Sequence, residues 1–82
     1  KGVDASFTLF MDNGTVNISA RSMGDFNVQL VMEALGGGGH LTMAGAQLSG
    51  VTIEQARQRL IQAIDEHWQS REHALAVQNA KE

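Results

Sequence analysis

The chain has 82 residues, six Lys and Arg against nine Asp and Glu, a formal net charge of −3 and no Cys. A chain of this length forms one domain at most and buries only about 60% of its unfolded surface, and without Cys it has neither disulfides nor thiolate metal sites. The acidic balance argues against non-specific nucleic-acid binding, which needs a basic surface, and no apolar run reaches the roughly 20 residues of a membrane span.

Residues 6–11 and 15–20 are expected to form a β-hairpin. The first run is rich in β-compatible residues, and the second alternates polar and apolar residues, as a strand with one buried face does. Asn13-Gly14 between them favours a tight turn, because both residues tolerate positive φ. The apolar side chains of the second strand should face the core, namely Val16, Ile18 and Ala20. Its polar side chains should lie on the other face, namely Thr15, Asn17, Ser19 and Arg21.

A short helix is expected after the hairpin. Asp25 or Asn27 can cap its start, and Gly36 can end it in a left-handed conformation. Its apolar stripe follows helical spacing and consists of Val28, Val31, Met32 and Leu35. Residues 41–45 are compatible with a short helical turn, and residues 46–49 with a short strand.

A longer helix is expected to begin next to Thr52, which is an N-cap residue whose capping box Gln55 closes. Its buried stripe should comprise Ile53, Ala56, Leu60, Ala63 and Ile64. Trp68 should pack at the edge of the core. Beyond it the apolar face is lost, so residues 1–68 are predicted to form the domain and residues 69–82 a helical or frayed tail.

Together these elements predict an α/β fold. It consists of a small mixed β-sheet with an N-terminal β-hairpin, a crossover helix, a Gly-rich loop and a long C-terminal helix. A crossover helix between the strands at residues 15–20 and 46–49 would make those two strands parallel.

Four consecutive glycines, Gly36, Gly37, Gly38 and Gly39, are followed by His40. Glycine loses more backbone entropy on folding than other residues, and one glycine suffices to end a helix, so the other three need a reason. One interpretation is a loop whose backbone N–H groups approach an anionic ligand closely. The other is a tight connection between a helix and a strand. The run is neither a Walker A loop nor a dinucleotide fingerprint, because it follows a helix and lacks the Gly-Lys-Ser/Thr end.

Arg21 is the second candidate binding residue. It ends the second strand, and strand ends in α/β sheets border ligand crevices. Its guanidinium fork matches phosphate oxygens, although a solvated Arg at a sheet edge is the plainer interpretation. The sequence shows no cluster of carboxylates and imidazoles for a metal pair and no nucleophile beside a base. We therefore expect a binding domain with no catalytic and no metal-ligating residue of its own.

Four segments carry a resemblance to a known family: residues 3–7 (VDASF), 18–22 (ISARS), 27–33 (NVQLVME) and 36–42 (GGGGHLT). In this layout the chain resembles the DHH-associated C-terminal domain of DHH phosphoesterases, from about residue 3 to residue 64. Within that superfamily it is most similar to the cyclic-di-AMP phosphodiesterases of Gram-positive bacteria.

The resemblance implies a two-lobed enzyme with its active site between the lobes. A DHH lobe holds a manganese pair on Asp and His residues, and the associated lobe contacts the substrate. By matching position, the substrate-binding residues are Arg21, Ser22, Asn27, Gly36, Gly37, Gly38, Gly39 and His40. The DHH lobe is not in this sequence, so the chain alone is expected to be inactive and to hold no cofactor. Because its first residue is Lys, we expect an N-terminally truncated part of a longer protein.

The same resemblance implies the reaction and the partners. The full-length parent would hydrolyse cyclic-di-AMP to linear pApA, with a cyclic dinucleotide or short oligonucleotide as substrate. Its DHH lobe would be the partner within the polypeptide. The lead-in helix that is usual in the family is expected to be cut off before Lys1, which could expose apolar surface and promote a homodimer. The parent is expected to be membrane-associated, with this domain on the cytoplasmic side and without membrane contact of its own.

Three alternatives remain open. The domain could belong to a DHH oligoribonuclease or polyphosphatase-like enzyme, which would prefer linear dinucleotides. It could be a nucleic-acid-binding appendage without a catalytic role, which predicts a basic face and salt-sensitive RNA binding. It could also be a regulatory or dimerisation module with no ligand, in which case no nucleotide would affect the glycine loop.

Overall fold

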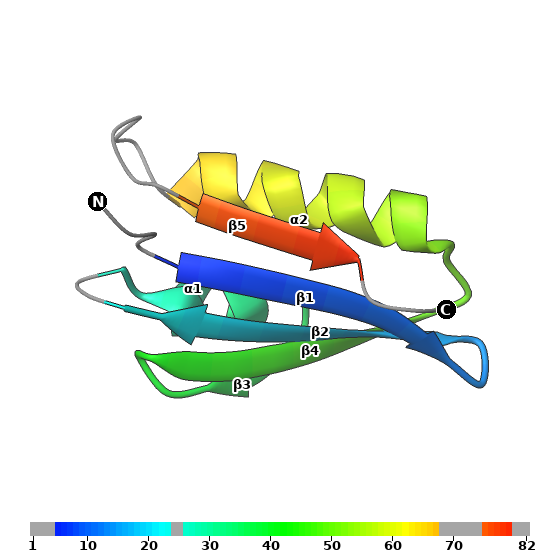
Figure 1. The fold of residues 1–82 in the computed structure, drawn as a ribbon, viewed down its shortest axis with the longest axis horizontal. Coiled ribbons are helices and arrows are strands. Elements are labelled where there is room, and N and C mark those ends of the chain that lie inside the picture. The colour runs from blue at the N-terminus through cyan, green and yellow to red at the C-terminus, as the bar shows by residue number, and fades with distance from the viewer. Residues whose placement is uncertain (1–4, 24–25, 68–74, 80–82) are drawn as a thin grey trace.

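The computed structural model describes residues 5–23, 26–67 and 75–79. They form a five-stranded sheet in the order β3-β4-β2-β1-β5 with two helices (Figure 1). The elements in chain order are β1 (Ala5–Asp12), β2 (Thr15–Ser22), α1 (Val28–Ala34), β3 (Gly38–Gly39), β4 (Met43–Ser49), α2 (Ile53–His67) and β5 (Leu75–Asn79). The predicted α/β class and mixed sheet are confirmed, since β1 pairs antiparallel with β2 and parallel with β5.

The predicted hairpin is confirmed. Asp12 pairs with Thr15 at the end of the β1–β2 ladder. Between them Asn13 has φ 55° and Gly14 has φ 77°. Two successive residues with positive φ form the type of turn whose twist matches that of the strands, which is why Asn-Gly occurs here.

The sheet has one buried face and one open face. Both helices lie on the same face (Figure 1), where the core is closed by Phe7, Leu9, Val16, Ile18 and Ala20 of the sheet and by Val28, Val31, Met32, Ile53, Ala56, Leu60, Ala63 and Ile64 of the helices. These are the apolar positions that the periodicity predicted. Phe26 adds an edge-to-face contact to Phe7, with ring centroids 6.2 Å apart. Neither of the two described helices lies on the opposite face of the sheet, and side chains alternate onto that face along β1, β2 and β4.

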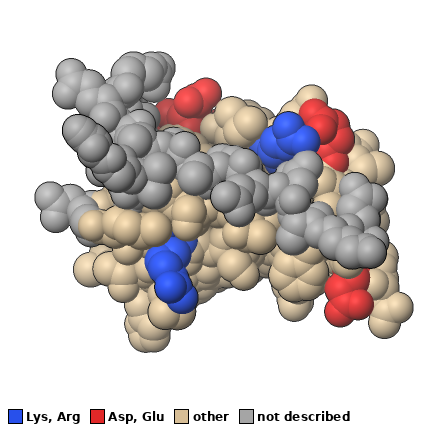
Figure 2. Space-filling model, in the orientation of Figure 1, with Lys and Arg blue, Asp and Glu red and all other residues tan. Residues whose placement is uncertain are grey.

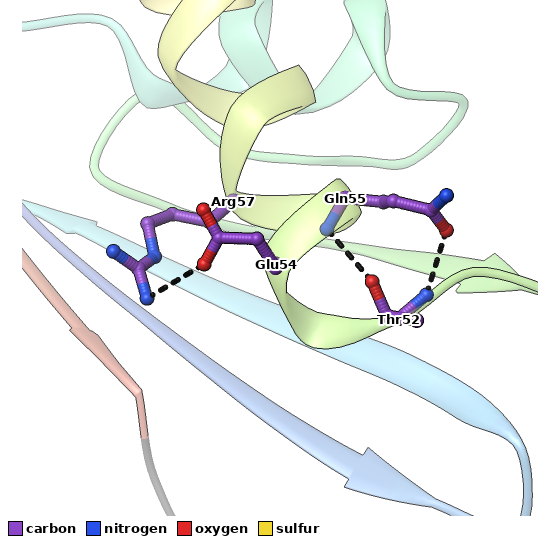
Figure 3. A network of polar contacts seen from close by, with 4 residues as sticks. All are labelled: Thr52, Glu54, Gln55 and Arg57. Carbon is purple, nitrogen blue, oxygen red and sulfur yellow. Dashed lines mark hydrogen bonds and ion pairs between the residues drawn. The ribbon is translucent and has the colours of Figure 1, made fainter.

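The start of α2 is fixed by the predicted capping box (Figure 3). The Gln55 backbone N–H donates to Thr52 Oγ1 at 3.0 Å, and the Thr52 backbone N–H donates to Gln55 Oε1 at 3.0 Å. Two of the donors that a helix start leaves unpaired are thereby satisfied. Glu54 and Arg57 form an ion pair of 3.2 Å, which contributes little because both side chains remain in contact with solvent.

The predicted parallel pairing of the 15–20 and 46–49 strands is wrong. β4 pairs antiparallel with β2, with Ile18 opposite Ala46. The crossover through α1 leads first to the two-residue strand β3, which runs in the direction of β2 and then reverses into β4. Residues 41–45 therefore do not form the expected helical turn: residues 41–42 are the bend of this reversal, and β4 already begins at Met43.

The expectation of a helical or frayed tail is wrong for residues 75–79. They form β5, which pairs in parallel with β1, Leu75 opposite Ala5 and Val77 opposite Phe7. Leu75 and Val77 are two residues apart, the period of a strand, and the free edge of β1 supplies main-chain partners that no helical pattern reveals. The rest of the tail and Trp68 lie outside the described residues, and the division at residue 68 stays a prediction. Within the described ranges, no helix is long and apolar enough to cross a membrane.

Candidate functional site

The open face of the sheet is organised in three rows that cross the strands. The pairing of β1, β2 and β4 places Ser6, Arg21 and Met43 in the first row, Thr8, Ser19 and Gly45 in the second, and Phe10, Asn17 and Gln47 in the third. Gly38 of β3 extends the second row, because it pairs with Gly45. The middle row thus consists of small residues between two rows of larger side chains.

This difference in size hollows the face, and we call the hollow the sheet groove. Two adjoining cavities make it up, of about 700 Å³ beside Arg21 and about 570 Å³ beside Phe10. Ser19, Gly38 and Gly45 line both cavities, so the middle row is the floor of one continuous groove. Its size suits a small organic ligand.

Two of the four glycines in the run are required by close packing against β4. A Cβ on Gly37 would lie 2.0 Å from the Gly45 carbonyl oxygen, and a Cβ on Gly39 would lie 2.5 Å from the Ala44 Cα. Gly36 has φ +87° and ends α1, with its N–H donating to the Glu33 carbonyl at 3.0 Å. The interpretation as a tight connection therefore explains Gly36, Gly37 and Gly39.

Gly38 is different from the other three. A Cβ added to it would meet no atom within 4 Å, and its φ is not in the left-handed region. Gly38 nevertheless lines both cavities of the groove. Packing does not require a glycine at this position, whereas an open groove floor does.

The amides of the glycine run are not all available to a ligand. The N–H groups of Gly36 and Gly37 donate to carbonyl groups of α1. His40 and Met43 exchange two main-chain hydrogen bonds, of 2.7 and 3.3 Å, across the β3–β4 turn. The next pair, Gly39 and Ala44, is then a non-hydrogen-bonded pair. The Gly39 N–H consequently points to the free edge of the sheet beside the groove.

Arg21 and His40 flank Met43 at the same end of the groove. Arg21 pairs with Met43 across β2 and β4, and His40 faces Met43 across the turn. Both side chains are exposed, and neither has a hydrogen bond or ion pair with the described residues. Of the Lys and Arg residues that the structure describes, Arg21 alone lies on the sheet, and Figure 2 shows that basic side chains are few and far apart on the side of the molecule that it draws.

Ser22 and Asn27 lie away from the groove. Ser22 is buried on the helix side of β2, and its backbone N–H donates to the Thr42 carbonyl at 2.8 Å. Asn27 caps α1, its Oδ1 accepting from the Leu30 N–H at 3.3 Å. These two residues hold the elements that carry Arg21 and the glycine run. Several further residues line the groove without belonging to a motif that marks them as site residues in the sequence: Ser6, Thr8, Phe10, Asn17, Ser19, Met43 and Gln47. Side chains of a strand alternate between its two faces. Steps of two residues from Arg21 along β2, and from its partner Ser6 along β1, would have indicated five of them: Ser6, Thr8, Phe10, Asn17 and Ser19.

Among the described residues, no three His, Cys, Asp or Glu side chains come together as possible metal ligands. Arg21 at the end of the sheet groove is exposed and has no partner among the described residues, which suits the recognition of an anionic ligand.

The described residues thus define a small α/β domain with a groove on the open face of its sheet. The family model described as the DHHA1 domain matches residues 1–70. The chain belongs to the DHHA1 domain family, as the glycine run and its neighbouring motifs predicted.

The similar proteins are much longer than this chain. The cyclic-di-AMP phosphodiesterase GdpP of Geobacillus thermodenitrificans is 58% identical over 69 residues, which are 83% of this chain and 10% of that protein. The bifunctional oligoribonuclease and PAP phosphatase NrnA of Thermus thermophilus is 43% identical over 51 residues, 62% of this chain and 16% of that protein. The chain thus spans about a tenth to a sixth of these curated relatives.

A solved structure shows the same fold. The exopolyphosphatase-related protein from Bacteroides fragilis superposes with a TM-score of 0.68 at 34% identity, covering 77% of this chain and 18% of that one. In the Bacteroides fragilis protein, too, the part that superposes on this chain is a small part of a longer polypeptide.

Proposed function

We propose that this chain is the substrate-binding lobe of a phosphodiesterase that hydrolyses cyclic-di-AMP to linear pApA. The observation that carries the proposal is the unpaired Arg21 guanidinium at the end of a groove whose floor is the glycine pair Gly38 and Gly45. The 58% identity to a cyclic-di-AMP phosphodiesterase supports this choice of substrate.

In the proposed complex, Arg21 neutralises a phosphate of the substrate through its guanidinium fork. The outward N–H of Gly39 and the ring of His40 stand at the same end of the sheet and donate hydrogen bonds to the remaining phosphate oxygens. Gly38 lets the ligand lie against the main chain, because no Cβ stands in the way. These groups supply positioning and charge neutralisation, the main protein contributions to phosphoryl-transfer sites.

The hydrolytic step belongs to the rest of the parent protein in this proposal. A DHH lobe would hold a manganese pair, which activates water and stabilises the charge on the phosphate. This chain alone would then bind without hydrolysing. The proposal further assigns the parent to the cytoplasmic side of the membrane and allows it to form a homodimer.

The test is an NMR titration of the 82-residue chain with cyclic-di-AMP, linear pApA and a short RNA. We expect the adenine dinucleotides to shift the signals of Arg21, Gly38, Gly39 and His40. The matched test in the full-length enzyme is a lower kcat/KM for Arg21→Ala and for His40→Ala. Unchanged kcat/KM in both variants, together with no shift at these residues, would reject the proposed role.

A DHH oligoribonuclease is the second candidate, favoured by the 43% identity to NrnA over 51 residues. The ratio of cyclic to linear dinucleotide affinity separates the two candidates, since an oligoribonuclease lobe should prefer the linear ligand. Salt-sensitive RNA binding without a dinucleotide response would instead indicate a nucleic-acid-binding appendage.

A further inference from the structure

The third row of the open face carries a combination of side chains that the proposed phosphate contacts do not use. Phe10, Asn17 and Gln47 stand side by side on β1, β2 and β4, and all three line the cavity away from Arg21. Phe10 keeps 36% of its surface exposed. The other large apolar side chains exposed on the described part of the chain are Met, Leu and Ile, so Phe10 is the aromatic one among them.

The two amides of this row are held in a fixed orientation. Gln47 Nε2 donates to Asn17 Oδ1 at 2.9 Å, and Asn17 Nδ2 donates to the Thr15 carbonyl at 3.4 Å. Gln47 keeps Oε1 and its second amide hydrogen without a partner among the described residues. It therefore presents one acceptor and one donor in the same row as an aromatic ring, with Asn17 between the two.

A donor and an acceptor on one amide match the edge of adenine, whose 6-amino group donates and whose N7 accepts. An exposed aromatic ring offers a surface on which a base can stack. Guanine presents acceptors at both O6 and N7, so the same amide pairs with it less well.

We propose that Phe10, Asn17 and Gln47 form a nucleobase subsite that selects adenine, separate from the phosphate contacts at Arg21. This inference rests on the proposed function, because it supplies the base recognition that a phosphate site lacks. Asn17 and Arg21 are four residues apart on β2, a separation of about 13 Å along the strand. A ligand that reaches both ends carries its base and the bound phosphate on different nucleotide units, as a dinucleotide does.

The experiment separates base from phosphate by using half-ligands. The side-chain amide signals of Asn17 and Gln47 and the backbone signal of Phe10 are followed by NMR in the 82-residue chain at millimolar adenosine, guanosine, ribose 5-phosphate and pApA. We expect adenosine to shift these three residues and to leave Arg21 and Gly39 unchanged. Ribose 5-phosphate should give the opposite pattern, and pApA should shift both groups.

Each other outcome decides against a defined part of the inference. Shifts by pApA at Arg21 and Gly39 without any response of the third row reject the base subsite and leave the phosphate site intact. Equal affinity for adenosine and guanosine rejects the selection of adenine by Gln47. No response of either group to any ligand rejects the base subsite and the proposed function together.

Variants test the same point by affinity. Loss of a stacking surface is expected to weaken pApA binding about tenfold in Phe10→Ala, while Phe10→Tyr retains it. Phe10→Leu keeps apolar bulk on β1 without a ring face and should weaken binding like Phe10→Ala, which keeps the test valid if the alanine variant unfolds. Ile61→Ala is the matched control, since Ile61 is a comparably exposed apolar residue on α2, outside the groove. Wild-type affinity in the Phe10→Ala and Phe10→Leu variants would overturn the proposal.

Discussion

Gly38 of β3 lies directly opposite Gly45 of β4, so the sheet has a strip of two adjacent strands without side chains. The glycines on either side of Gly38 contact the backbone of β4 too closely for any Cβ, whereas Gly38 has open space where its Cβ would be. One run of identical residues therefore contains positions required by packing and one position that keeps the groove open.

The first prediction separates these two requirements at Gly38. Gly38→Ala should leave the free energy of unfolding within about 0.5 kcal/mol of wild type, because the added methyl group meets no neighbour. The same methyl group stands in the groove and should weaken dinucleotide binding by about tenfold. Urea unfolding and a ligand titration of the same sample measure both effects. Wild-type affinity in a folded Gly38→Ala protein would contradict a ligand lying across this floor.

The second prediction concerns Gly37, the neighbouring glycine. A Cβ here would overlap the Gly45 carbonyl oxygen at 2.0 Å, so Gly37→Ala must displace β4 or α1. Overpacking of this kind costs about 1–3 kcal/mol. Thermal unfolding should show a clearly lower Tm for Gly37→Ala than for Gly38→Ala. Equal Tm values in the two variants would show that Gly37 does not pack closely enough against β4 to exclude a Cβ.

The third prediction addresses Arg21. Its side chain is exposed and has no partner among the described residues, so Arg21→Ala should not change the unfolding free energy by more than about 0.5 kcal/mol. Loss of a charged hydrogen bond, about 1.5–3 kcal/mol, should weaken dinucleotide binding by about 10- to 100-fold. The dinucleotide affinity of Arg21→Lys should lie between those of wild type and Arg21→Ala, since Lys keeps the charge and loses the planar fork.

The control for Arg21 is Arg59→Ala, which removes an exposed Arg from α2. Isothermal titration calorimetry with pApA at two salt concentrations compares the variants. Wild-type binding should weaken more steeply with salt than that of Arg21→Ala, because the phosphate contact is electrostatic. Equal losses in Arg21→Ala and Arg59→Ala would indicate a general effect of charge and not a contact in the groove.

The sequence allowed local structure to be predicted better than strand pairing. The Asn13-Gly14 turn, the Asn27 cap and the α2 stripe depend on residues close in the chain, and all three are confirmed. The direction of β4 depends on β3, which has only two residues and no side-chain pattern. β5 depends on the edge of β1, some 70 residues earlier. The direction of β4 and the formation of β5 therefore depend on pairing between strands, which a short stretch of sequence does not reveal.

The candidate site was predictable in part for the same reason. The loop and strand-end motifs indicated Arg21, the glycine run and His40. The structure places Arg21 and His40 at one end of the groove, and it places the glycine run along the groove, from the cavity beside Phe10 to the cavity beside Arg21. The sequence did not distinguish Gly38 from its neighbours, because the difference lies in the distance to β4. Nor did it single out Phe10 or Gln47, whose alignment with Asn17 requires the register of three strands.

The last prediction tests whether α2 depends on its capping box. Thr52→Ala removes the acceptor of the Gln55 N–H and should destabilise the fold by about 1 kcal/mol. Gln55→Ala removes the reciprocal bond to the Thr52 N–H, and its effect should be smaller because Gln55 lies within α2, where the higher helix propensity of Ala offsets part of the loss. Since each side chain satisfies the other residue's backbone, the double variant should lose less than the sum of the single losses. Gln58→Ala, an exposed substitution in the same helix, provides the control. Strict additivity in denaturant unfolding would show that the two bonds form independently and do not act as one cap.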